Sequence, residues 1–175
     1  MKIQEVIRTI NEMQADGIIE RYAIGGAVGA TFYLEPMSTL DVDVFVPFKS
    51  EPGSFLITPQ PLFDYLRGRG CEVKGEYIVI GEWPVQFLPP TSPLVEEALD
   101  QAISRDVGGV PVRVFCAEHL AAIALQTGRA KDKARLLQFL ESGVLNAAKF
   151  EEIVTRHGLV DAWQRFARQF LGDAS

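Results

Sequence analysis

The sequence predicts an α/β (or α+β) fold, in which a mixed, mostly antiparallel sheet is flanked by helices and followed by a helical C-terminal part. Short β-branched runs bounded by glycine and proline lie mainly before residue 116. Helical periodicity dominates after it. Gly-Glu breaks at 75–76 and 81–82 indicate hairpins between neighbouring strands. We therefore expect a core over 1–115 and a helical part over 116–175 packed on it, or one single domain.

Composition restricts the class of protein. The 175 residues are 47% hydrophobic and 23% charged, which is typical of a globular chain that buries a core without disulfides. The net charge of −6 gives no global attraction to phosphate backbones, so nucleic acid is not indicated as a partner. The N-terminus lacks a signal-peptide apolar region, and no apolar run is long enough to span a membrane. We expect a cytoplasmic protein without a membrane partner.

The first half of the chain alternates helices with short strands. Apolar residues at three- and four-residue steps predict a helix from residue 3 that stops at Gly17. A strand is expected near 22–24, a short buried helix over 27–34 and a strand over 41–46, where acidic and apolar residues alternate. A proline-rich loop follows. The remaining elements are a helix around 62–66 and strands at 72–74, 77–80 and 84–88.

The second half is mainly helical. Apolar periodicity predicts helices over 93–103, 117–126, 131–140, 149–157 and 159–170, the last two being split by Gly158. Valine alternation predicts one further strand over 110–115. The apolar stripe of the last helix is interpreted as core, with a homodimer interface as the second reading.

Two short motifs carry the chemical signal. Gly25-Gly26 lies between a strand and a helix, where the backbone can approach a ligand and helix N–H groups can meet phosphate. Asp41 and Asp43 share one face of a strand, and their repulsion favours a divalent cation between them. Each motif alone also fits a tight turn or an exposed strand end. In combination they predict a phosphate and Mg²⁺ (or Mn²⁺) site suited to phosphoryl or nucleotidyl transfer.

These residues resemble the minimal nucleotidyltransferase superfamily, in particular its small bacterial AbiEii-like and antitoxin-type members. In that family a Gly-Gly or Gly-Ser turn and a helix precede a Thr-x-Asp-x-Asp strand, which Gly25, Gly26, Thr39, Asp41 and Asp43 match. The resemblance implies a nucleotidyltransferase-like sheet, glycines that hold nucleotide phosphates, and aspartates that bind the metal. The match is strongest over 22–46 and extends loosely to about residue 140.

Further residues qualify this resemblance. Lys131 could neutralise phosphate charge, although a solvated helix face with Asp132 and Arg135 explains it equally well. Active members carry a third carboxylate on a later strand, and Gln86 occupies the candidate position here. An amide is neither an anionic ligand nor a base, so two-metal catalysis would need Glu82 or Asp132 instead.

The remaining reactive side chains are interpreted as structural. Cys71 and Cys116 lie beside apolar runs outside a CxxC spacing, which indicates two reduced thiols near a core. His119 is expected to pack in a helix, and His157 to end one. We therefore expect neither a zinc site nor a nucleophilic triad.

The leading hypothesis is a Mg²⁺-dependent enzyme that transfers NMP from an NTP to a hydroxyl of a protein, RNA or small molecule, with Asp41 and Asp43 as catalytic and metal-binding residues. Gly25, Gly26, Thr39 and Lys131 would bind the nucleotide. One alternative is a catalytically impaired nucleotide-binding or interaction protein of the same fold, such as one half of a toxin–antitoxin pair with a protein partner. A purely structural acidic pair is the other.

Overall fold

A mixed sheet forms the centre of the computed structural model, which describes residues 3–34, 41–49 and 57–172. The sheet has seven strands in the order β3-β4-β5-β2-β1-β7-β6. They are β1 (Ala23–Gly25), β2 (Val42–Phe45), β3 (Glu72–Lys74), β4 (Tyr77–Ile80), β5 (Trp83–Leu88), β6 (Ile103–Val107) and β7 (Val110–Val114). The helices are α1 (Ile3–Ala15), α2 (Gly26–Ala30), α3 (Gln60–Gly68), α4 (Pro93–Asp100), α5 (Ala117–Thr127), α6 (Ala130–Ser142), α7 (Ala147–Arg156) and α8 (Val160–Phe166).

The strand directions confirm the predicted fold class. Strands β3, β4 and β5 form an antiparallel meander, and β6 and β7 form an antiparallel hairpin. The two units are joined through β1 and β2, which are antiparallel to each other. Strand β1 is parallel to β7, and β2 is parallel to β5. The sheet is therefore mixed and mostly antiparallel, and the last third of the chain is helical.

One face of the sheet is closed by α1 and α3. The apolar stripe of α1, formed by Val6, Ile7, Ile10 and Met13, is fully buried. It packs in one cluster with the valines of β2 and β7 and with Leu62 and Leu66 of α3. Because side chains alternate along a strand, burying these valines directs Asp43 of β2 and Gln86 of β5 to the opposite face.

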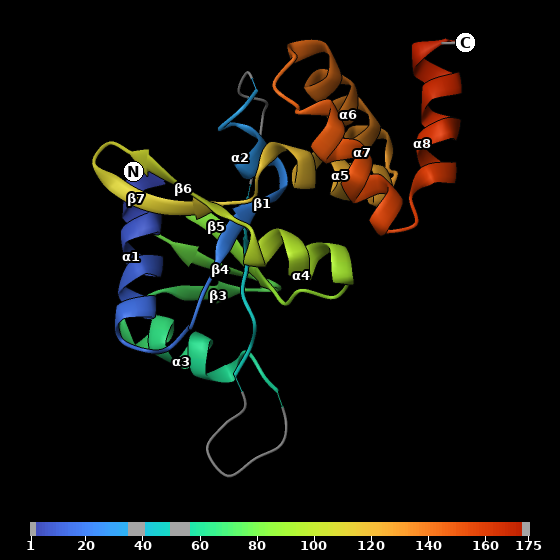
Figure 1. Ribbon diagram of the computed structural model, residues 1–175. Helices are drawn as coiled ribbons and strands as arrows, with labels where there is room; N and C mark the ends of the chain where they lie inside the picture. Colours follow the sequence, from blue (N-terminus) through green and yellow to red (C-terminus); the bar gives the residue numbers. More distant parts are fainter. Residues whose placement is uncertain (1–2, 35–40, 50–56, 173–175) are drawn as a thin grey trace.

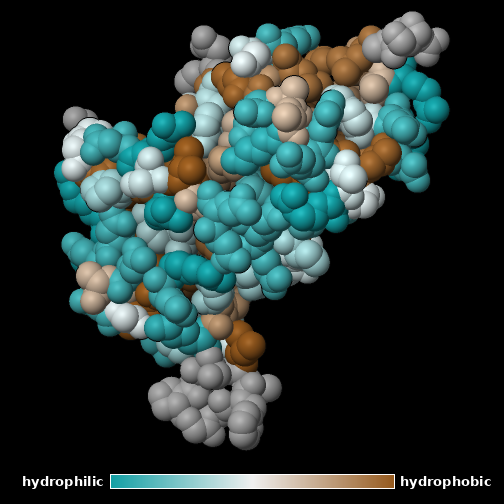
Figure 2. All heavy atoms as spheres, viewed as in Figure 1, coloured by the Kyte–Doolittle hydropathy of each residue, from teal (hydrophilic) through white to brown (hydrophobic). Residues whose placement is uncertain are grey.

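The helical part packs beside that opposite face. A second cluster of buried apolar residues includes side chains from all the helices from α4 through α8, together with Ala23 and Phe115 from the sheet side. Figure 1 shows α5, α6, α7 and α8 grouped together, away from α1 and α3. In Figure 2, hydrophilic side chains cover most of the visible face, and apolar ones gather near the top, over the helical part. The described residues thus form a half-covered sheet next to a helical bundle.

Three predicted boundaries differ from the structure. The helix expected over 93–103 ends at Asp100, and Ile103–Val107 forms β6, which turns at Gly108-Gly109 into β7. The polar centre of this edge strand lacks the apolar alternation that identifies buried strands. The helix expected over 27–34 is the five-residue α2 followed by a turn. The last helix becomes π-helical over Ala167–Leu171.

Candidate nucleotide and metal site

Asp43 is the centre of the candidate site. It lies on β2 between Gly25 of β1 and Gln86 of β5, which are its partners in the strand register. Its Oδ1 atom is buried and has no hydrogen-bond partner among the described residues. A buried carboxylate oxygen without a partner is costly unless a donor or a cation satisfies it. The geometry therefore leaves one strong acceptor for a ligand.

The double glycine makes room for side chains of the protein itself. Gly26 has a φ of +59°, and a Cβ at this position would collide with Oδ2 of Asp43. A Cβ on Gly25 would lie 2.7 Å from the ring of Phe45 and 3.0 Å from that of Phe115. These two rings pack with centroids 4.9 Å apart. Both glycines therefore allow close packing around Asp43, whatever contact they also make with a ligand.

Asp41 lies one residue before β2, close enough to affect Asp43 electrostatically. The pKa of Asp43 is raised from 3.8 to about 6; burial is the largest cause, the charge of Asp41 acts in the same direction, and Lys131 and Arg135 oppose the shift. The same acidic pair acts on Tyr77 of β4, whose pKa is raised chiefly by the charge of Asp41. Tyr77 therefore belongs to the surroundings of the site, which the sequence analysis did not recognise.

Helix α6 contributes the positive charges. Lys131 and Arg135 lie near enough to lower the pKa of Asp43. The pKa of Arg129 is raised chiefly by its hydrogen bond with Asp132, and the charge of Asp43 adds to this shift. The Nε atom of Arg135 is buried without a hydrogen-bond partner among the described residues. An unpaired donor on α6 thus accompanies the unpaired acceptor on β2.

Asp132 is occupied by the start of α6. Only 2% of it is exposed, and it accepts hydrogen bonds from the Nε and the backbone N–H of Arg129 in a capping arrangement. Arg135 Nη1 also lies 3.8 Å from its Oδ1. Because Asp132 neutralises α6 itself, Lys131 is left as an exposed cation beside the acidic pair. The contact of Lys131 with phosphate stays a prediction.

Gln86 is the direct neighbour of Asp43 on β5, in the register that the sequence analysis assumed. Its Nε2 donates a hydrogen bond to Oε2 of Glu76 at 2.9 Å, which brings a carboxylate from the β3–β4 turn toward this row. Glu82 precedes Gln86 by four residues, or roughly 13 Å along an extended strand. The carboxylate that is hydrogen-bonded to Gln86 is therefore that of Glu76, and not that of Glu82 or Asp132.

Other expected residues add less. Thr39 falls outside the described residues. Within 3–34, 41–49 and 57–172 no group of three or more histidine, cysteine, aspartate or glutamate side chains is arranged to hold a metal ion. Glu76 and Tyr77 were missed because their importance depends on strand pairing. The alternation of residues 77–80 together with the hairpin at 81–82 was the signal that could have placed Tyr77 beside Gln86.

Comparison with solved structures identifies the fold. An antigenic nucleotidyltransferase-like protein from Paracoccidioides brasiliensis superposes with a TM-score of 0.64 at 14% identity, covering 97% of this chain and 88% of that one. The chain has a nucleotidyltransferase-like fold. ANT(2'')-Ia in complex with adenylyl-2''-tobramycin superposes with a TM-score of 0.54 at 16% identity, covering 94% of this chain and 98% of that one.

The solution structure of the antibiotic-resistance factor ANT(2'')-Ia gives the same TM-score of 0.54 at 16% identity, covering 95% of this chain and 96% of that one. No protein-family model and no curated protein matches the sequence. The nucleotidyltransferase-like fold is thus shown by structure alone.

Among the described helices, none has both the length and the apolar character needed to cross a membrane.

Proposed function

We propose that this protein is a divalent-metal-dependent nucleotidyltransferase that transfers NMP from an NTP to a hydroxyl of a protein, RNA or small molecule. One observation carries the proposal: among the described residues the buried Oδ1 of Asp43 has no hydrogen-bond partner, on a nucleotidyltransferase-like sheet and near the positive charges of Lys131 and Arg135. A Mg²⁺ or Mn²⁺ ion would satisfy that oxygen and relieve the repulsion between Asp41 and Asp43. The donor set is oxygen only, as such an ion prefers.

The residues of the chain would act mainly by positioning and by neutralising charge. Asp41 and Asp43 would hold the ion, which supplies charge neutralisation at the phosphates. Lys131 and the free Nε of Arg135 would bind phosphate oxygens from the other side. Gly26 would keep the Asp43 carboxylate against the β1–α2 turn. The acceptor oxygen bonds to the α-phosphorus as pyrophosphate leaves.

The proton of the acceptor hydroxyl needs a base, and Glu76 is the candidate. Its carboxylate is exposed and hydrogen-bonded to Gln86, in the row of Asp43. Gln86 itself has no basic atom, so its part would be to position Glu76. The neighbouring structure with an adenylylated aminoglycoside supports a hydroxyl acceptor for the fold, without identifying one for this chain.

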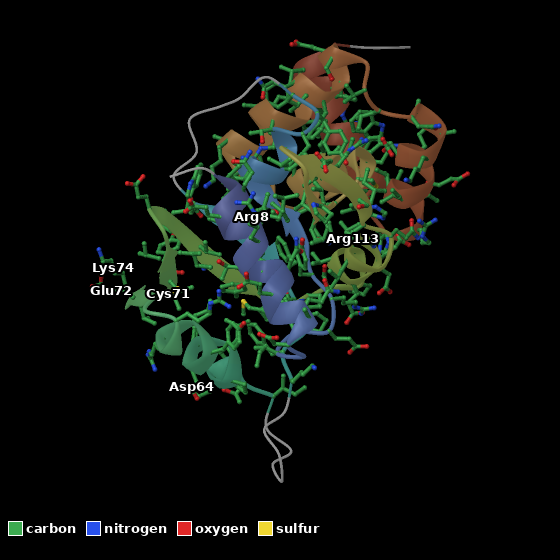
Figure 3. The ribbon with its side chains drawn as sticks, turned by 90° about the vertical axis from the view of Figure 1, so that its left-hand side faces the viewer. Arg8, Asp64, Cys71, Glu72, Lys74 and Arg113 are labelled. Atoms are coloured by element: carbon green, nitrogen blue, oxygen red, sulfur yellow. The ribbon has the colours of Figure 1, made fainter. Side chains whose placement is uncertain are left out.

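Nucleotide binding can be tested by thermal unfolding with Mg²⁺ and each of the four NTPs. We expect one or more NTPs to raise the Tm of the wild type, because a ligand that binds the native state stabilises it. The rise should be lost in Asp43→Asn. Asp64→Asn is the matched control, since Figure 3 shows Asp64 on α3, which covers the other face of the sheet.

Transfer is tested separately with α-labelled NTP and a panel of hydroxyl acceptors, by following pyrophosphate release. NTP binding without pyrophosphate release for any acceptor would favour the second candidate, a catalytically impaired nucleotide-binding protein such as one half of a toxin–antitoxin pair. The amide at position 86 and the lack of a three-carboxylate cluster among the described residues favour that candidate. No Tm shift with any NTP would contradict both.

A further inference from the structure

A buried network of reactive side chains joins α4, α5 and α7. Cys116 is the N-cap residue of α5, and its Sγ lies 2.8 Å from Nδ1 of His119, one turn later. The opposite ring nitrogen, Nε2, lies 2.8 Å from Oε2 of Glu97 on α4. Thiol, imidazole and carboxylate thus form a continuous chain. The sequence analysis treated both Cys116 and His119 as core residues and overlooked their three-residue spacing.

Glu97 is held as a carboxylate chiefly by Arg156. Arg156 of α7 donates to its two oxygens at 2.7 Å and 3.0 Å, and Nε2 of His157 lies 3.2 Å from Oε2. The hydrogen bond from Arg156 is the largest cause that lowers the pKa of Glu97 to about 2, against a smaller opposing effect of burial. A fixed carboxylate of this kind stabilises the protonated form of the adjacent imidazole.

A second cation, Lys149, contacts the thiol of Cys116 directly. Lys149 of α7 lies with its Nζ 3.4 Å from Sγ of Cys116 and 3.4 Å from Oε1 of Glu118. The carboxylate of Glu118 and the phenol of Tyr33 are the other titratable groups whose charges couple to this region. Tyr33 donates its hydroxyl proton to the carbonyl of Phe115, so it does not compete for the sulfur.

These contacts favour a thiolate. Burial alone would raise the pKa of Cys116, but the hydrogen bonds from His119 and the charge of Lys149 outweigh it and lower the pKa. Burial alone would likewise lower the pKa of His119, yet Cys116 and Glu97 raise it. The N-terminal end of α5 adds favourable partial charge, as helix N-termini do for cysteines.

We propose that Cys116 is an oxidation-sensitive thiolate that reacts with small hydroperoxides through its pairing with His119, Glu97 and Lys149. The sulfur attacks one peroxide oxygen, a sulfur–oxygen bond forms and the oxygen–oxygen bond breaks. Sulfur loses two electrons to the peroxide and becomes a sulfenic acid. The leaving hydroxide or alkoxide takes the proton of His119, so the products are water or an alcohol. Because only 4% of Cys116 is exposed, the proposal is restricted to oxidants as small as hydrogen peroxide.

Cys71 provides a control within the same molecule. It is more exposed than Cys116, yet burial raises its pKa, against a weaker opposing effect of Arg69. It precedes β3, at the edge of the sheet farthest from β7, and Figure 3 shows it beside α3. Exposure alone predicts faster oxidation of Cys71, whereas the network predicts faster oxidation of Cys116.

The experiment treats the native protein with hydrogen peroxide at pH 7, quenches with catalase, and unfolds the chain in urea with dimedone and N-ethylmaleimide. Mass spectrometry then gives the oxidised fraction of each cysteine over time. We expect Cys116 to oxidise about tenfold faster than Cys71, because the thiolate is the reacting form. Equal rates, faster oxidation of Cys71, or no oxidation of Cys116 would overturn the proposal.

A variant pair tests the mechanism. Glu97→Gln removes the charge that supports the imidazolium, whereas Glu96→Gln changes an exposed carboxylate of the same helix. Between pH 8 and 6 the Cys116 rate of the wild type should fall less than that of Glu97→Gln. Circular dichroism confirms folding. A folded Glu97→Gln protein with the wild-type rate and pH profile would contradict the network, and the Cys71 comparison needs no variant.

Discussion

The carboxylate of Asp43 occupies the space that a side chain at position 26 would need. Gly26 combines this contact with a φ of +59°, a conformation that L-residues with a side chain rarely adopt. The double glycine is thus explained first by the acidic strand that packs against it. The double glycine and the acidic strand therefore form one structural unit.

Gly26→Ala should lose stability for two reasons, conformational strain and collision with Asp43. We expect a loss of about 2–4 kcal/mol in the free energy of unfolding, measured by urea denaturation. Gly17→Ala is the matched control, because Gly17 has a φ of +75° and no atom within 4 Å of an added Cβ. Equal losses in the two variants would show that contact with Asp43 contributes nothing.

The pH dependence of stability should report on Asp43. Its pKa is 3.8 in the unfolded reference and about 6 in the fold, so between these values the folded chain binds more protons. Stability from this group therefore falls as pH rises from 4 to 6 in the absence of metal. Asp43→Asn should remove that fall and stabilise the metal-free protein by about 1–3 kcal/mol at pH 8.

The measurement is the urea midpoint of wild type, Asp43→Asn and the control Asp64→Asn from pH 4 to 8. If Asp43→Asn gained as much stability over the wild type at pH 4 as at pH 8, the result would contradict the raised pKa of Asp43. With Mg²⁺ present at pH 8, the wild type should become more stable than Asp43→Asn, because the metal stabilises only the carboxylate form.

Gln86→Glu would place a third carboxylate beside Asp43 in the strand register. Without metal the new charge should destabilise the fold by about 1 kcal/mol, because like charges on paired strands repel. With Mg²⁺ or Mn²⁺ the variant should bind metal about tenfold more tightly than the wild type, as measured by calorimetry. Gln60→Glu on α3 controls for added charge, and a matching gain there would refute the site-specific explanation.

The variants Lys131→Ala and Lys133→Ala distinguish the contributions of two α6 lysines to NTP binding. The charge of Lys131 acts on Asp43, whereas Lys133 lines a cavity of about 320 Å³ with Arg165 and Phe166 on the helical side. Under the proposed function, Lys131→Ala should weaken NTP binding about tenfold, as expected for the loss of one phosphate contact. Lys133→Ala should leave binding within about twofold. Equal effects in titrations with a fluorescent NTP would show that only the net charge matters.

Acid sensitivity should depend on Glu97. Because its pKa is lowered in the fold to about 2, its contribution is present above its ordinary value of 4.5 and is lost as pH falls toward 2. Glu97→Gln should cost about 1–2 kcal/mol at pH 7 and less at pH 3. Melting curves at both pH values check this, with Glu96→Gln as the control. A Glu97→Gln cost that does not shrink at pH 3 would contradict the lowered pKa.

Much of the fold follows from local pattern. The helix from residue 3, the acidic strand at 41–46, the meander of 72–88 and the C-terminal helices were predicted because apolar period and glycine or proline breaks are properties of neighbouring residues. Strand β6 was missed because its central Ser-Arg-Asp carries no buried face. An edge strand of this kind is identified by its partner β7, which no local pattern reveals.

The candidate site divides in the same way. Asp41, Asp43 and the double glycine were predicted from the sequence because they are close along the chain and their chemistry suits phosphate and metal. Their roles, and that of Lys131, stay predictions. The contribution of Glu76 and Tyr77 was not predicted, since it depends on the pairing of β4, β5 and β2.

Residue type and short-range spacing were enough to predict most helices and strands, though not β6, and to locate the motif that bears acidic charge. The packing of distant segments, in contrast, places the Asp43 carboxylate against Gly26 and brings Glu97 to His119 and to Arg156. These contacts join elements distant along the chain, such as Glu97 and Arg156, 59 residues apart. Their energies come from burial and charge proximity, which exist only once the sheet and the helices have packed together.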